Sequence, residues 1–266
     1  MPIDIAASFS FGLPEPTDVL LQFEAAAIPE QQILASDCRM SEAEGLVRVP
    51  AQDAIGERIW LRAEGLYQVE YSAQVQVERM IADIAGLEAL APHALPGEVV
   101  QYLFDSRYCP GGRLQPFVGA EFGGLCGGAR IAAIRDWIAS KFTYRPGCST
   151  PTTTALDSFV ERRGICRDYA HVTIALARAS AIPARYASVY APGVEPPDFH
   201  AVAEVFLADP SVPGGGAWHL VDATGMADPA KMVKIGVGRD AADVSFMTVF
   251  GNAELRDKMV AVTFSG

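Results

Sequence analysis

The sequence contains no run or cluster of basic residues. It has 21 Lys and Arg against 32 Asp and Glu, which gives a formal net charge of −11. Proteins that bind a phosphate backbone neutralise it with grouped Lys and Arg side chains. The charge balance therefore argues against a nucleic-acid partner, and it favours solubility while weakly disfavouring acidic partners.

Long apolar stretches are also missing. Residues 1–13 lack the positively charged start and the apolar core of a secretory signal. No stretch stays apolar for long enough to span a bilayer. We therefore expect a cytoplasmic protein without a membrane partner.

Cysteine is scarce and irregularly spaced. The five cysteines form no CxxC motif and stand at positions Cys38, Cys109, Cys126, Cys148 and Cys166. An odd number without paired spacing argues against a disulfide framework and against a zinc ribbon. We expect no metal, no cofactor and at least one free thiol.

The first part of the chain is predicted to be a small antiparallel sandwich or sheet. Apolar and polar residues alternate strictly over 67–77, which is typical of a strand with one buried and one solvated face. Shorter strand candidates lie near 31–35, 46–49 and 57–62. Because residues 91–128 are rich in Pro and Gly, we divide the chain into a β-rich domain at 1–100 and a second domain at 101–266.

The second part mixes helices and strands, which predicts an α+β fold. Ile131, Ile134 and Ile138 have helical spacing. Thr154 and Asp157 resemble a capping box for a helix that runs to Arg163 and ends at Gly164. The pattern further predicts a buried helix at about 166–180, strands at about 185–190, 200–207 and 218–222, and a turn at 210–216.

Cys166 stands at the first turn of the predicted buried helix. The unpaired N–H groups and the positive dipole end of a helix start stabilise an anion. A thiolate is the reactive form of cysteine, so the position favours a nucleophile. A small buried hydrophobic residue is the alternative role, which most free cysteines have.

His200 and Asp222 are expected to meet in a hairpin. A turn centred near residues 211–212 sets His200 roughly opposite Asp222, where a hydrogen bond would fix the His tautomer. Alternatively, each residue simply bounds a strand. Together with Cys166, however, they supply the nucleophile, base and orienting group that acyl transfer needs. His171 would lie about 140° from Cys166 around the helix and is expected to be structural.

Four segments resemble the bacterial transglutaminase-like superfamily, whose members are often described as cysteine proteases. They are residues 153–171, 182–190, 198–206 and 218–224, and segment 102–109 is also similar. The resemblance implies a papain-like core in which a helix carrying Cys166 packs on an antiparallel sheet carrying His200 and Asp222, the three forming a triad. Ala223 replaces a common proline, and Val202 replaces a common aromatic residue.

From the resemblance and the roles above we expect hydrolysis of a peptide or amide substrate. The Cys166 N–H would stabilise the oxyanion, with Tyr144 as second donor. Arg167, Asp168 and Arg239 would border the site, although structural ion pairs explain them equally well. The open alternatives are a transglutaminase, an acetyltransferase, a non-catalytic binding module and a three-ligand metal site. The sequence specifies neither substrate identity nor oligomeric state.

Overall fold

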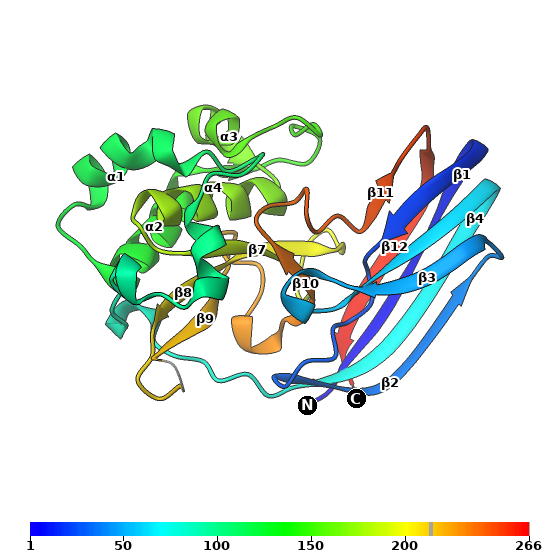
Figure 1. Ribbon diagram of the computed structural model, residues 1–266, viewed down its shortest axis with the longest axis horizontal. Helices are drawn as coiled ribbons and strands as arrows, with labels where there is room; N and C mark the ends of the chain where they lie inside the picture. The colour runs from blue at the N-terminus through cyan, green and yellow to red at the C-terminus, as the bar shows by residue number, and fades with distance from the viewer. Residues whose placement is uncertain (213–214, 266) are drawn as a thin grey trace.

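Two antiparallel sheets organise the chain, and helices lie beside only the second of them (Figure 1). The computed structural model describes residues 1–212 and 215–265. The first sheet has six strands, with β11, β1, β4 and β2 in that order, β12 paired with β1, and β3 paired with β4. Its strands are β1 (Ile3–Leu21), β2 (Gln31–Met40), β3 (Glu44–Pro50), β4 (Glu57–Val77), β11 (Met247–Val249) and β12 (Glu254–Phe264).

The predicted strand at 67–77 is confirmed as part of β4. Tyr67, Val69 and Tyr71 are buried, while the residues between them are exposed. The separate candidate at 57–62 belongs to the same strand, because β1 pairs along both segments of β4 with a register shift between Leu13 and Thr17. Long pairing with β1 therefore joins what the sequence presents as two short strands.

The C-terminal strands belong to the first sheet. β12 pairs with β1 from Ile3 opposite Phe264 to Gly12 opposite Glu254. The division at residue 100 had assigned this segment to the second domain, and the pairing corrects that assignment. An unpaired edge of β1 would expose a row of backbone donors and acceptors, and β12 covers it.

The second sheet carries four strands in the order β10, β7, β8, β9. They are β7 (Ala184–Tyr190), β8 (His200–Ala208), β9 (Gly216–Val221) and β10 (Val233–Gly238), and a two-stranded pair joins β5 (Thr143–Tyr144) to β6 (Arg163–Gly164). In the expected turn at 210–216, residues 213 and 214 lie outside the described residues. The helices are α1 (Gln115–Phe122), α2 (Gly127–Lys141), α3 (Ala155–Glu161) and α4 (Cys166–Ala179).

Six short 3-10 helices complete the described elements: η1 (Gln52–Ala54), η2 (Ile84–Gly86), η3 (Pro92–Ala94), η4 (Gly97–Leu103), η5 (Gly111–Leu114) and η6 (Pro229–Lys231). Within the described residues, no single helix has the length and apolarity needed to cross a membrane. The segments 111–122 and 127–141 meet that requirement only together, as a pair bent by 96°.

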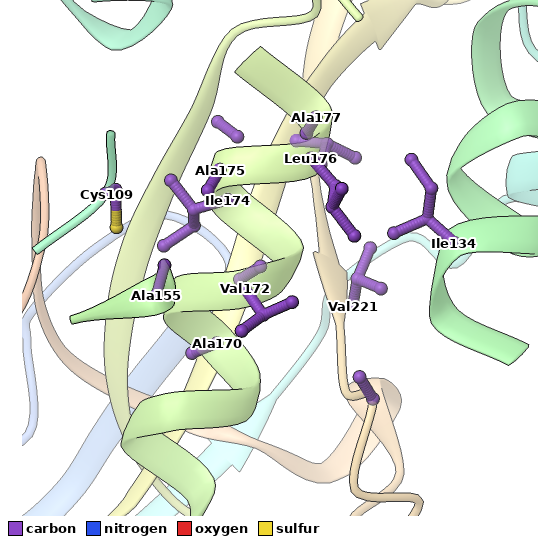
Figure 2. Packing of buried hydrophobic residues seen from close by; sticks show 14 of the residues in the cluster. Cys109, Ile134, Ala155, Ala170, Val172, Ile174, Ala175, Leu176, Ala177 and Val221 are labelled. Atoms are coloured by element: carbon purple, nitrogen blue, oxygen red, sulfur yellow. The ribbon is translucent and has the colours of Figure 1, made fainter. Parts of the chain in front are cut away.

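Helix α4 is buried on almost every side, as its apolar sequence predicts. Figure 2 shows Leu176 directed toward Ile134 and Val221, while Ile174 faces the side on which Ala155 and Cys109 lie. Ile174 and Leu176 are completely buried. A helix enclosed in this way fixes the position of its first residue, Cys166.

Helix α3 begins as predicted but ends earlier. Its capping box is present, since Thr154 N–H donates to Asp157 at 2.8 Å and Asp157 N–H donates to Thr154 at 3.4 Å. Arg162 ends the helix in the left-handed region, with φ of 56°. Gly164 lies in β6 instead, where an added Cβ would come within 2.5 Å of the Asp168 Cβ. This glycine allows the approach to α4 rather than ending α3.

A buried charge network connects the second sheet to the N-terminal region. Glu204 on β8 accepts from Arg185 at 2.7 Å and also contacts Lys234. Arg185 pairs in addition with Asp53 at 2.7 Å, and Lys234 pairs with Glu30 at 2.6 Å. Burial raises the pKa of Glu204, but the two cations outweigh it and lower this pKa to about 2.

Glu204→Gln should reduce the free energy of unfolding by about 3 kcal/mol, because it leaves two buried cations undercompensated. The lowered pKa means that Glu204 contributes stability above its unfolded value of 4.5 and loses it as pH falls toward 2. Urea unfolding at pH 7 and pH 3 measures both effects. The exposed Glu161→Gln is the control, and equal stability of the two variants would show that the network adds no net stability.

Candidate active site

Cys166 is the first residue of α4, and its half-buried thiol lies at the helix start. The preceding residue, Ile165, is extended and donates its N–H to Asp168 at 2.9 Å. Asp168 is fully buried, so its carboxylate caps this helix end from within. The cap holds Cys166 at the positive end of the helix dipole.

His200 and Asp222 form the predicted hydrogen bond, with His200 Nε2 3.0 Å from Asp222 Oδ2. His200 begins β8, and Asp222 directly follows β9. The predicted register is wrong, because Ala203 pairs with Val221 and this places Asp222 in line with Val202. The difference along β8 is two residues, which keeps a side chain on the same face. The contact therefore forms diagonally rather than directly across the pair.

Asp222 is held by its own turn. Its Oδ1 accepts from the Thr224 N–H at 2.8 Å and from the Thr224 hydroxyl at 2.7 Å, and its Oδ2 accepts from the Ala227 N–H at 3.1 Å. Burial raises the pKa of Asp222, but the contact with His200 and the two Thr224 hydrogen bonds outweigh burial and lower this pKa. The sequence Asp222-Ala223-Thr224 fits such a side-chain turn, a local signal that the strand pattern alone does not show.

Cys166 and His200 line one groove of about 590 Å³. His200 Nδ1 is buried and makes no hydrogen bond within the described residues, while Nε2 is occupied by Asp222. Burial lowers the pKa of His200, but the Asp222 hydrogen bond and the neighbouring Cys166 side chain raise it to about 9. The site thus favours an imidazolium beside the sulfur at neutral pH.

Tyr144 lies on β5 and has Cys166 as a neighbour. Burial raises the pKa of Tyr144, and the neighbouring Cys166 side chain raises it further. The phenol therefore stays protonated and can donate a hydrogen bond at neutral pH.

The three charged residues expected at the border have different surroundings. Arg167 lines the groove, where it donates to the Thr150 carbonyl at 2.9 Å and pairs with Asp168 at 3.1 Å. Asp168 is the buried helix cap and does not line the groove. Arg239 pairs with Asp243 at 2.9 Å and is not among the described lining residues. Asp168 and Arg239 therefore have structural contacts.

The structure adds groove residues that the sequence patterns did not identify as site residues: Arg107, Asp198, Phe199, Phe246 and Lys258. Arg107 lies in segment 102–109, and Asp198 and Phe199 lie in segment 198–206, both of which resemble the family. Phe246 and Lys258 lie outside every segment that showed the resemblance.

His171 is fully buried and structural, as expected. Its Nε2 accepts the Ala241 N–H at 3.1 Å, and its ring stacks on Tyr108 at 5.2 Å. Burial lowers the pKa of His171 well below its usual value. Within residues 1–212 and 215–265, no group of three His, Cys, Asp or Glu side chains has an arrangement suited to a metal ion.

Comparison with known proteins places this site in a family. Residues 125–223, which contain Cys166, His200 and Asp222, match the family model of the transglutaminase-like superfamily. Uncharacterised proteins of Mycobacterium leprae and Mycobacterium tuberculosis H37Rv are 33% and 36% identical over 127 and 128 residues, or 44% and 43% of this chain. These matches span 42% and 40% of the relatives' own lengths.

A solved structure from Cytophaga hutchinsonii, described as a "putative cysteine protease", matches nearly the whole chain. It superposes with a TM-score of 0.89 and 32% sequence identity, covering 99% of this chain and 90% of that one. The family and this neighbour support a thiol-dependent enzyme in general. With such identity over almost the full length of both chains, the protein belongs to the transglutaminase-like superfamily.

Proposed function

We propose that this protein hydrolyses peptide or amide bonds, with Cys166 as nucleophile, His200 as acid and base, and Asp222 as the group that orients His200. The observation that carries the proposal is the asymmetric environment of the imidazole. Asp222 occupies Nε2, while buried Nδ1 has no hydrogen-bond partner in the described chain and Cys166 adjoins the ring. This nitrogen is therefore available for the thiol proton.

The reaction follows from these roles. The Cys166 thiolate attacks the carbonyl carbon, and a carbon–sulfur bond forms. When the tetrahedral species collapses, the carbon–nitrogen bond breaks and His200 gives its proton to the leaving amine. His200 then takes a proton from water, and the water oxygen bonds to the thioester carbon. The carbon–sulfur bond breaks, which releases the carboxylic acid and leaves the Cys166 thiolate. The thiolate and the His200 imidazolium of the starting state are thereby restored.

The developing oxyanion would be stabilised by two donors. The Cys166 N–H belongs to the first turn of α4, where backbone N–H groups lack helical partners. Tyr144 supplies a protonated hydroxyl beside the same residue. Both donors exist before substrate binds, which is the arrangement that electrostatic catalysis requires.

Hydrolysis is tested by treating a peptide library with the purified protein in H₂¹⁸O and identifying new termini by mass spectrometry. We expect new carboxyl termini that carry ¹⁸O, and their loss after iodoacetamide treatment. Iodoacetamide should label Cys166 faster than the other four thiols. Uniformly slow labelling without turnover would favour a binding module, and incorporation of an added fluorescent amine in place of ¹⁸O would identify a transglutaminase.

The raised pKa of His200 predicts an upper pH limit for turnover. The imidazolium must protonate the leaving amine, so kcat should fall as pH rises through about 9, the pKa of His200. The stability contributed by this charged state should be lost over the same range, from about 6.5 to about 9. A kcat profile from pH 6 to 10 measures the limb. A fall in kcat centred near pH 7 would contradict an imidazolium at His200 that is stabilised by Asp222 and Cys166.

A further inference from the structure

The groove carries a cation that has no role in the proposed chemistry. Arg107 lines the groove together with Cys166 and His200. Its guanidinium carbon lies 5.0 Å from the centroid of the Tyr108 ring. Among the described residues, no carboxylate forms an ion pair with Arg107. A positive charge at this position contrasts with the net charge of −11 for the chain.

The other charges of the groove are already compensated. Arg167 pairs with buried Asp168 at 3.1 Å. Lys258 pairs with Asp198 at 2.6 Å. Within the described lining, Arg107 is therefore the cation left available to a ligand. Phe199 and Phe246, which stack at 5.1 Å, add an apolar surface to the same groove.

The backbone around Arg107 is firmly held. On one side, Ser106 accepts from buried Arg178 at 2.9 Å. On the other side, the Tyr108 N–H donates to buried Asp240 at 2.8 Å, and the Tyr108 hydroxyl donates to the Pro151 carbonyl at 2.7 Å. Stacking on Tyr108 further restricts the Arg107 side chain. Binding an anion there would cost little additional ordering, because the guanidinium is already positioned.

We propose that Arg107 makes the enzyme selective for acyl donors that carry a carboxylate near the scissile bond, that is, for acidic peptides. The inference rests on the proposed function, since it requires Cys166 to attack the donor. A guanidinium that has no carboxylate partner can bind a carboxylate through two parallel N–H donors. Arg107 is exposed, but it lines the groove that also holds Cys166, so a carboxylate bound to it would lie in the same groove as the thiol. An arginine outside this groove would have no such effect on chemistry at Cys166.

Two alkylating reagents of nearly equal size test the charge effect without a known substrate. Iodoacetate is anionic and iodoacetamide is neutral, and site-resolved mass spectrometry gives the alkylation rate of Cys166 with each. The measured quantity is the iodoacetate-to-iodoacetamide rate ratio. In Arg107→Gln we expect this ratio to fall about threefold to tenfold, and to fall further in Arg107→Glu. The fall should shrink at high salt.

Arg113→Gln is the matched control, because Arg113 is exposed nearby in the chain but does not line the groove. Its rate ratio should equal that of the unmodified protein. An unchanged iodoacetamide rate in the Arg107 variants shows that the thiol site remains folded. Equal ratios in the unmodified protein, Arg107→Gln and Arg107→Glu would overturn the inference while leaving the proposed function intact. Failure of both reagents to prefer Cys166 would overturn the proposed function and this inference with it.

Discussion

A Cys166→Ala variant should lose hydrolytic turnover by about 10⁴-fold or more, because it removes the atom that forms the thioester. Folding should be retained. Alanine is the best helix former, and the Cys166 thiol is only half-buried, so its loss leaves no large cavity. Turnover in the peptide-library assay measures the loss, and thermal unfolding measures the retained fold.

The same substitution should also lower the pKa of His200 from about 9, since the neighbouring Cys166 side chain raises it. Titration of the His200 ring by NMR measures this shift independently of any substrate. Cys126→Ala removes an exposed thiol and is the control, with full turnover expected. Full turnover in Cys166→Ala would exclude this residue as nucleophile.

The parts of the site that could be predicted from sequence are those set by local patterns. The start of α4 followed from the apolar residues after Cys166, and the helix is buried accordingly. The pairing of His200 with Asp222 was predicted from a wrong register, yet the contact is present. Side chains alternate between the two faces of a strand, so a register error of two residues leaves His200 on the same face as Asp222. The contact could therefore be predicted although the register was wrong.

The parts that could not be predicted depend on contacts distant in the chain. Phe246 and Lys258 reach the groove because β11 and β12 return to β1, more than 200 residues away in sequence. No period-two or helical pattern specifies which edge a late strand will cover. The sequence likewise did not show that Arg107 lines the groove, because contacts with the distant residues Asp240 and Arg178 help to position its loop.

Asp222→Asn should reduce turnover by about 10⁴-fold through the wrong tautomer of His200. Oδ1 accepts two hydrogen bonds from Thr224, whereas Oδ2 accepts one from Ala227 besides the contact with His200. The amide oxygen of Asn should therefore take the Oδ1 position and place its NH₂ group against His200 Nε2. This NH₂ group would donate to Nε2, so the ring proton would move to Nδ1, the nitrogen that must accept from Cys166.

Asp209→Asn is the matched control for this substitution. Asp209 accepts from the Ser211 N–H at 3.0 Å and from its hydroxyl at 2.6 Å, the same kind of turn as at Asp222 but outside the groove lining. Loss of a turn contact alone would affect both variants alike, whereas a tautomer effect is confined to Asp222→Asn.

The pH at which the residual activity of Asp222→Asn falls should also move below 9, because the Asp222 hydrogen bond raises the pKa of His200. If Asp222→Asn keeps turnover within tenfold of the unmodified protein and its activity still falls near pH 9, Asp222 only shapes the hairpin.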